Sequence, residues 1–342
     1  MSAIRFGLIG LGFHGQRYAR HLMRDIDGAE LYAVCRQDPA RGEAFAREHN
    51  VRYYREYLDL LSDPKVEAVV VVTPPYLNER ICTTAAQAEK PVLVEKPLAH
   101  NTRAGLNIVE AVARAGTVFM VGHTLRFNAV VCALEDRLDE LGPIHTISIN
   151  QRLEPPQRVW MDNFAQAGGG VILHTGVHIF DLIRYLSGDE VRRVYCETDR
   201  IVYEELEDSF VAMLRLRRSG VRCLVDAARY TAGRSGRIEV VGEQGQLVGD
   251  HVHGYGMIIR GRQLEPLDLP APVNTVEETL KAFMRTLCNG DEPPISAVDG
   301  LQTLEIAEAC YHSASSGAAV DLYSDDEEEA DEDDLHDDMW SL

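Results

Sequence analysis

Lys96 is the residue whose setting most clearly suggests chemistry. It follows the apolar run Pro91-Val92-Leu93-Val94 and Glu95 directly. Ligands of parallel sheets bind beyond the carboxyl ends of the strands, so a strand over this run would deliver Lys96 to a binding site. Pro97 biases Lys96 away from helical angles. An ammonium held out of bulk water has a lowered pKa and can exchange a proton with a substrate oxygen. The alternative is a surface lysine paired with Glu95.

A second group of candidate residues follows three consecutive glycines, Gly168 to Gly170. His174, His178 and Asp181 stand at i, i+4 and i+7, which places them on one face of a helix predicted to run to about Leu186. The glycines would let the start of this helix approach a ligand closely. Two histidines four residues apart are also a metal-ligand spacing, but the H-E-x-x-H pattern is missing, so no metal is predicted.

The elements that must position these side chains begin with a nucleotide-binding pattern. The apolar run Ile4 to Ile9 leads into a G-x-G-x-x-G turn, and an amphipathic segment with Tyr18 and Leu22 follows. Such glycines let the backbone approach a pyrophosphate, and the helix N-terminus attracts that anion. The pattern therefore predicts a bound dinucleotide. The predicted contacts in this turn are Gly10, Gly12, Phe13, His14 and Gly15.

Arg36 indicates which dinucleotide is bound. It ends the predicted second strand, Ala29 to Cys35, where Asp or Glu usually binds the ribose 2′-hydroxyl. A guanidinium cannot accept from a hydroxyl, but it can donate to a 2′-phosphate and stack on adenine. NADP is therefore favoured over NAD. The alternative is that Arg36 is solvated and Asp38 binds the ribose.

Residues 1–122 alternate apolar runs with segments of helical periodicity. Glu67 to Val72 is a continuous run of mostly β-branched residues, as in a strand buried on both faces. Asn101 is predicted to cap a helix whose apolar stripe contains Leu106, Val109 and either Val112 or Ala113. Strands alternating with helices predict an α/β fold with a doubly wound parallel sheet, a Rossmann domain. The five predicted strands are 4–9, 29–35, 67–72, 91–94 and 118–121.

Residues 123–322 are predicted to form an α+β domain with a large, mostly antiparallel sheet. Strand-like runs here follow one another directly, and Arg218-Ser219-Gly220 resembles a hairpin turn. A large sheet with few helices leaves one face open, so we expect a homodimer or homotetramer through that face. The predicted strands are 146–153, 193–198, 209–216, 221–228, 237–241 and 255–260, with helices over 276–287 and 301–312.

Charge and length limit the function classes. The 342 residues exceed the usual size of one core, so two domains are expected. A net charge of −20 argues against nucleic acid or an anionic membrane as partner. Eleven acidic residues and no lysine or arginine lie between Asp325 and Leu342, which leaves about −9 for the rest. We expect residues 323–342 to be a disordered tail, or a binding peptide ending in Met339-Trp340.

The cysteines and the apolar segments indicate the compartment. The seven cysteines form no C-x-x-C pair, and their odd number suits a reducing cytosol. No signal-peptide pattern precedes the first strand, and no apolar stretch reaches the ~18 residues of a membrane span. A cytoplasmic location is therefore expected.

The ordered set of motifs resembles the glucose–fructose oxidoreductase/inositol dehydrogenase family (Gfo/Idh/MocA) over residues 3 to about 322. Besides the motifs above, the resemblance includes Thr73-Pro74-Pro75 and Gly122-His123 with Arg126-Phe127-Asn128. It implies an NAD(P)-dependent oxidoreductase acting on sugars, inositols and related diols, with Lys96 and His178 as the proton-handling pair. It also implies a set of residues that line the cofactor. These are Gly10, Gly12, Gly15, Arg36, Thr73, Pro74, Glu95 and Lys96.

Two positions depart from the family pattern. His174 stands where many polyol dehydrogenases of the family have Asp, and Asn78 stands where His is more common. A neutral imidazole holds a cationic Lys96 less well than a carboxylate does, which leaves the substrate and the direction open, although His174 can still exchange hydrogen bonds. The alternatives to a dehydrogenase are a non-catalytic dinucleotide-sensing regulator and an NAD-assisted glycosidase on the same fold. Arg152, Arg158, Trp160 and Asn163 are weaker candidates for substrate contacts.

Overall fold

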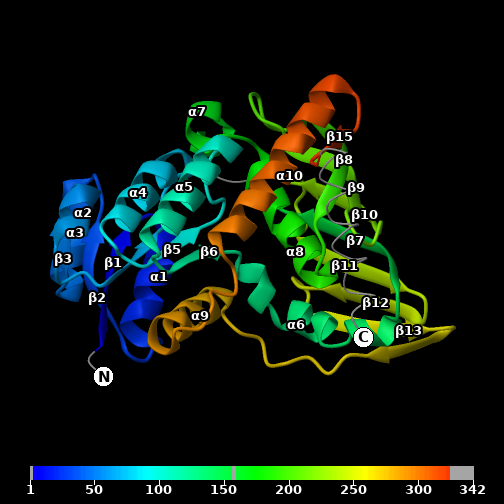
Figure 1. The fold of residues 1–342 in the computed structure, drawn as a ribbon, viewed down its shortest axis with the longest axis horizontal. Coiled ribbons are helices and arrows are strands. Elements are labelled where there is room, and N and C mark those ends of the chain that lie inside the picture. The colour runs from blue at the N-terminus through cyan, green and yellow to red at the C-terminus, as the bar shows by residue number, and fades with distance from the viewer. Residues whose placement is uncertain (1–2, 156–158, 324–342) are drawn as a thin grey trace, which may run out of the picture.

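Two sheets, joined by helices, form the described part of the molecule (Figure 1). The computed structural model describes residues 3–155 and 159–323, so the predicted acidic tail lies outside the described residues from 324 onward. Within the described part, no helix is both long and apolar enough to span a membrane.

The first sheet is a parallel, six-stranded sheet with the order β3-β2-β1-β4-β5-β6. This confirms the predicted α/β class, but β3 was not predicted, because three residues carry too little periodicity. All four residues of β4, β5 and β6 are buried in each strand, as helices on both faces require. The strands are β1 (Ile4–Ile9), β2 (Ala29–Cys35), β3 (Arg52–Tyr54), β4 (Ala68–Val71), β5 (Val92–Glu95) and β6 (Phe119–Gly122).

The helices of this half begin where the local signals place them. Asn101 caps α5 by accepting a hydrogen bond from the Ala104 amide at 2.8 Å, as expected. The predicted stripe of α5 was wrong in part, because Leu106 is exposed and Ile108 is buried instead. The helices are α1 (Phe13–Arg24), α2 (Pro39–His49), α3 (Tyr57–Ser62), α4 (Pro75–Gln87) and α5 (Thr102–Ala115).

The second sheet has nine strands in the order β14-β13-β12-β11-β7-β10-β9-β8-β15. Its neighbours are antiparallel except β7 and β10, which confirms a mostly antiparallel sheet. Strands β12, β14 and β15 were not predicted. The strands are β7 (Ile144–Arg152), β8 (Val191–Asp199), β9 (Ser209–Leu216), β10 (Arg222–Ala228), β11 (Ser235–Gly242), β12 (Gly245–Asp250), β13 (Tyr255–Arg260), β14 (Gln263–Pro266) and β15 (Val320–Asp321).

In the described part of the chain, helices cover one face of the second sheet and leave the other face open. Residues of β9 alternate between buried and exposed, and Val211 and Met213 are exposed on the outer face. Leu224 of β10 joins them there. The inner face packs against α8 and α10 (Figure 1). The remaining helices are α6 (Ala129–Glu135), α7 (Phe164–Ala167), α8 (Val177–Ser187), α9 (Thr275–Asn289) and α10 (Ala297–Ser316).

Helix α10 joins the two sheets, since it packs against α5 and β6 on one side and α8 and β8 on the other (Figure 1). Two glycines allow this close approach. A Cβ at Gly300 would lie 2.9 Å from Val121 of β6, and one at Gly105 of α5 would lie 2.9 Å from Leu304 of α10. A side chain at either position would force Val121 or Leu304 to shift.

Candidate active site

The glycine turn between β1 and α1 has the shape that a dinucleotide needs. Gly10 has a φ of +100°, and a Cβ there would lie 2.1 Å from the Val72 carbonyl oxygen. A Cβ at Gly15 would lie 1.9 Å from the Gly10 carbonyl oxygen. A Cβ added at Gly12, by contrast, would have no atom of the described residues within 4 Å, so this side of the turn is open. The turn is therefore tightly packed behind and open where a pyrophosphate would approach α1.

Arg36 lies at the glycine turn, whereas Asp38 is engaged elsewhere. The Arg36 Nη1 atom donates to the carbonyl oxygen of Leu11, and Nε is buried without a hydrogen-bond partner among the described residues. Asp38 caps α2 by accepting from the Arg41 amide at 3.2 Å. The guanidinium thus borders the open side of the turn, and the carboxylate of Asp38 serves the helix that follows.

Asn78 joins two loops that the family resemblance assigns to the cofactor. Its Oδ1 accepts from the Thr73 hydroxyl at 2.7 Å. Its Nδ2 donates to the carbonyl oxygens of Pro97 and Leu98 at 3.1 and 3.2 Å. Asn78 is buried, so it fixes the loop after β4 relative to the loop after β5. Thr73-Pro74 and Lys96 are held next to each other in this way.

The Glu95 carboxylate is buried under α1. Its Oε1 accepts from His14 Nε2 at 2.7 Å and from the Tyr18 hydroxyl at 2.6 Å. Burial alone would raise the pKa of Glu95, but the hydrogen bond and charge of His14 and the nearby Lys96 lower it below its ordinary value. His14 therefore packs against Glu95 from the start of α1, while Phe13 beside it is exposed.

Lys96 follows β5 and reaches toward α8. Its Nζ atom donates to the backbone oxygen of His174 at 2.9 Å, its only hydrogen bond among the described residues. The peptide bond from Lys96 to Pro97 is cis. Burial lowers the pKa of Lys96 to about 8; Glu95 opposes this shift and Arg229 adds to it. Lys96 is thus poised to give or take a proton near neutral pH.

The predicted single helix after the glycines is a π-helical turn, Ile172–Gly176, followed by α8. This turn separates the three residues expected on one face. The ring of His174 lies with Nε2 3.1 Å from the Ala167 carbonyl oxygen, and burial lowers the pKa of His174 to about 3. His174 therefore meets Lys96 through its backbone oxygen. Such π turns are frequent at functional sites.

His178 occupies the first turn of α8 and is only half-buried. Its Nδ1 is buried and has no hydrogen-bond partner among the described residues, which leaves Nε2 as the nitrogen facing the accessible side. The ring packs edge-on against His123, with centroids 6.2 Å apart. Burial, with the positive charge of Lys96 and the neighbouring His123, holds the pKa of His178 well below its ordinary value. His178 is therefore a neutral acceptor near neutral pH.

Glu207 fixes the glycine-rich start of this segment. Its carboxylate accepts from the Gly170 and Ile172 amides at 3.0 and 3.1 Å, and from the Tyr311 hydroxyl at 2.7 Å. A Cβ at Gly170 would lie 2.0 Å from the Glu207 carbonyl oxygen, so only glycine fits there. Gly170 thus lets the π turn pack closely against Glu207, and a close approach of this segment to a ligand stays a prediction.

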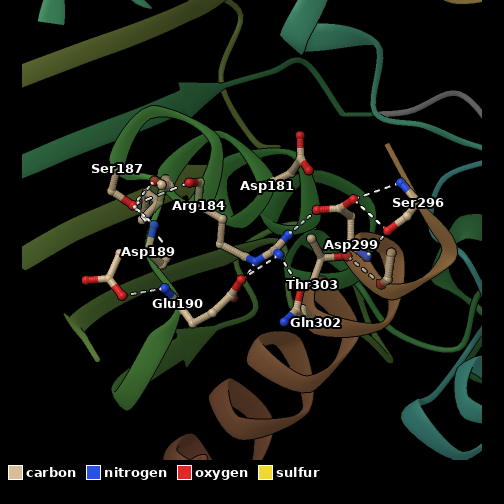
Figure 2. Close-up of polar contacts among 12 residues, drawn as sticks. Asp181, Arg184, Ser187, Asp189, Glu190, Ser296, Asp299, Gln302 and Thr303 are labelled. Atoms are coloured by element: carbon tan, nitrogen blue, oxygen red, sulfur yellow. Dashed lines mark hydrogen bonds and ion pairs between the residues drawn. The ribbon is translucent and has the colours of Figure 1, made fainter. Parts of the chain in front are cut away.

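The far end of α8 is anchored by a network of ion pairs, part of which Figure 2 shows. Arg184 donates to Glu190 at 2.6 Å and to Asp299 of α10 at 3.1 Å. Asp181 forms a bidentate pair with Arg126, with contacts of 2.6 and 2.9 Å. Asp181 is therefore a structural residue of α8, and its carboxylate does not reach Lys96 or His178.

The inner face of the second sheet contributes polar groups that the sequence did not single out. Gln151 at the end of β7 is buried, and its Oε1 has no partner among the described residues. A side chain at Gly236, the β11 partner of Gln151, would meet the His251 ring at 2.1 Å. Arg229 follows β10 and donates to the Thr175 hydroxyl at 2.9 Å. Alternation along the strands could have indicated these residues only once the sheet order was known.

The weaker candidates divide. Arg152 pairs with Asp226 of the neighbouring strand β10 and also donates to the backbone oxygen of Gln151 at 3.5 Å, so its guanidinium is held by the sheet. Arg158 and the Trp160 side chain lie outside what is described. Where the structure is described, metal-ligating atoms come together in one group, His21, Asp25 and Glu277, at the contact of α1 and α9. That group contains neither His174 nor His178.

Comparisons with known proteins agree with this geometry. Residues 4–123 match the model "Oxidoreductase family, NAD-binding Rossmann fold", and residues 137–248 match "GFO/IDH/MocA C-terminal domain". The chain belongs to the Gfo/Idh/MocA family. Its relatives include myo-inositol 2-dehydrogenase of Thermotoga maritima, 28% identical over 93% of this chain and 98% of that protein. D-apiose dehydrogenase of Paraburkholderia graminis is 30% identical over 93% of this chain and 89% of that protein.

A solved structure also resembles the whole described fold. The aldose-aldose oxidoreductase from Caulobacter crescentus, complexed with glycerol, has a TM-score of 0.86 and 25% identity, covering 93% of this chain and 99% of that one. The chain is thus an oxidoreductase-family member along almost its whole length, with relatives named dehydrogenases and reductases.

Proposed function

We propose that this chain is an NADP-dependent oxidoreductase that interconverts a secondary alcohol and a carbonyl on a sugar, an inositol or a related diol. The observation that carries the proposal is the approach of Lys96 to the π turn and α8 beyond the parallel strands. Two basic groups with lowered pKa values, Lys96 and His178, act on one another electrostatically there. The family and the names of its members support the reaction class.

The residues at the glycine turn fit the dinucleotide. Gly12 leaves the turn open, Gly10 and Gly15 pack it tightly, and the α1 N-terminus offers unpaired amides to a pyrophosphate. Arg36 would donate to the 2′-phosphate that distinguishes NADP. Thr73, Pro74 and Glu95 would line the nicotinamide half. The bound cofactor supplies a carbon that accepts or returns hydride.

The protein's own groups handle the proton. In alcohol oxidation, the neutral His178 imidazole takes the hydroxyl proton at Nε2, and Lys96 stabilises the developing negative charge on the oxygen by hydrogen bonding. The His174 backbone oxygen holds Nζ in place, at 2.9 Å. In carbonyl reduction, the same groups return the proton. His174 supports Lys96 as a positioning residue through its backbone, since its ring faces the Ala167 carbonyl.

The experiment that tests this function is an activity screen of the full chain with inositols and sugars, followed by absorbance of the reduced nicotinamide. Lys96→Ala should lower turnover by about 10²- to 10⁴-fold, the usual contribution of a proton-transfer group, while leaving cofactor binding nearly unchanged. Lys65→Ala, at an exposed lysine, is the matched control. If Lys96→Ala retained the full rate on a validated substrate, the proposed role of Lys96 would be refuted.

Three broader expectations belong to the same proposal. They are a boundary between the domains near residue 122, a cytoplasmic location, and self-association through the outer face of the second sheet. All seven cysteines are free thiols, in accord with a reducing compartment. Exposed Val211, Met213 and Leu224 make the outer face suitable for an apolar contact.

A further inference from the structure

Three arginines form an unbalanced row across the outer face of the second sheet. Arg193 of β8 is paired in register with Arg215 of β9, which is paired with Arg222 of β10. All three are exposed. Like charges directly opposite each other in neighbouring strands destabilise a sheet unless an anion compensates them. We call Arg193, Arg215 and Arg222 the arginine row.

Only the first member of the row has a carboxylate partner in the described part of the chain. Arg193 donates to Asp321 of β15 at 2.6 and 2.9 Å. Arg215 and Arg222 form no ion pair with any described residue. Among the described residues, the carboxylate that pairs with the row belongs to β15, the C-terminal strand at the edge of the sheet.

An apolar groove accompanies the arginine row. The cavity beside it has a volume of about 600 Å³. The side chains of Tyr195, Met213 and Leu224 occupy the next register row of β8, β9 and β10 and line the groove together with the arginines. The surface thus combines cationic groups with exposed apolar ones, and it suits a ligand that carries both carboxylates and a large apolar side chain.

The C-terminal tail carries both carboxylates and a large apolar side chain, and it begins at the edge of the same sheet. Residues 324–342 follow β15, the strand next to β8, and contain eleven carboxylates followed by Met339-Trp340. Arg222 lies three strand spacings from β15, about 15 Å. Nineteen extended residues span about 60 Å, so the tail is long enough to reach the whole row and the groove. We propose that residues 324–342 dock on the arginine row and the adjoining groove of their own chain.

A second copy of the chain suits the arginine row less well than the tail does. In a two-fold interface both copies contribute the same patch, so a contact centred on the row would bring two sets of three arginines together. The tail instead brings negative charge, and covalent attachment gives it a high effective concentration. The docked tail therefore competes with self-association through the same face.

Fluorescence of Trp340 tests the proposal in the full-length chain. Trp160 is the only other tryptophan, so a Trp160→Phe background reports Trp340 alone. We expect Trp340 to be shielded from acrylamide at low salt. The quenching constant should at least double in about 1 M NaCl, where the Debye length falls to about 3 Å. The double variant Arg215→Glu/Arg222→Glu should produce the same increase at low salt.

The control has the same charge change on the other half of the molecule, Arg20→Glu/Arg103→Glu, at two exposed arginines. It should leave quenching unchanged. The proposal would be overturned if Trp340 had the same quenching constant in the Trp160→Phe protein with and without Arg215→Glu/Arg222→Glu. It would also be overturned if that quenching constant did not change with salt. Shielding that appears only at high protein concentration would also overturn it and assign the groove to contacts between copies.

Discussion

At the residue scale, Arg36 determines the expected cofactor preference. Its guanidinium borders the glycine turn, whereas Asp38 is used as a helix cap. Arg36→Asp should reverse the preference from NADP to NAD, changing the ratio of the two kcat/KM values by about ten-fold or more, since a charged hydrogen bond contributes about 1.5–3 kcal/mol. Steady-state kinetics with both cofactors measures this, and Arg41→Asp on exposed α2 is the control. If the ratio of the two kcat/KM values did not change, Arg36 would not determine the cofactor preference, and Asp38 would be the residue that binds the ribose.

Lys96 sets the expected pH dependence. Because burial lowers its pKa to about 8, Lys96 loses its proton as the pH rises through 8. The protonated Lys96 donates to the substrate oxygen in both directions of the proposed reaction, so carbonyl reduction and alcohol oxidation should both slow as the pH rises above 8. Glu95 raises the pKa of Lys96 by its charge, so Glu95→Gln should move the break to lower pH. Profiles of kcat/KM from pH 6 to 10, about two units on each side of the Lys96 pKa, measure the position of the break and its shift in Glu95→Gln.

The sequence indicated which residues lie at the candidate site more readily than which atoms they contact. Lys96 contacts His174 through the backbone oxygen rather than the ring, and the catalytic roles of Lys96, His174 and His178 stay predictions. Nothing in the sequence distinguishes a π turn from an α-helix over residues 172–176, because both bury the same apolar residues. The inner-face residues Gln151 and His251 could not be predicted, because only the register of β7 and β11 places Gly236, which borders the His251 ring, opposite Gln151.

At the scale of elements, Asn78 links the loops after β4 and β5. Asn78→Ala would leave the buried carbonyl oxygens of Pro97 and Leu98 without a donor, which costs about 1–3 kcal/mol. We expect a loss of that size in the free energy of unfolding, measured by urea denaturation, and weaker cofactor binding by titration. The control is Asn107→Ala, which removes one hydrogen bond between α5 and Glu79 of α4. Equal effects of both changes would contradict a special role for Asn78.

The success of element prediction followed the strength of each local pattern. The buried run at β4 and the hairpin between β9 and β10 were confirmed because each has an unambiguous signal. Strand β12 was missed because Gly245 and Gly249 interrupt its apolar pattern. Strand β15 has two residues, and its position is set by pairing with β8 rather than by its own sequence. Edge strands of this kind depend on tertiary context.

At the scale of the whole molecule, docking of the tail predicts an unusual salt dependence of self-association. A chain that ends at Tyr323 should have a higher average mass at a given concentration than the full chain, because its apolar groove is exposed. High salt should raise the mass of the full chain for the same reason. Sedimentation velocity measures both masses.

A full-length chain whose eleven tail carboxylates are replaced by Asn and Gln separates charge from length. It should behave like the shortened chain, since the arginine row then has no anion to bind. Identical masses for all three chains across concentration and salt would contradict competition between the tail and a second copy. Circular dichroism verifies that each chain is folded.

Helix α10 has a mechanical consequence for turnover. It is packed through Gly300 against β6 and through Leu304 against α5, and it also covers α8 and β8. A hinge motion that separated the two sheets would expose the apolar surface that α10 buries, which is unfavourable in free energy. Structures solved with and without ligands should therefore superimpose as one rigid body. Entry and exit of substrate would then depend on side chains and surface loops, so the catalytic rate would be insensitive to changes that stiffen the junction between the halves.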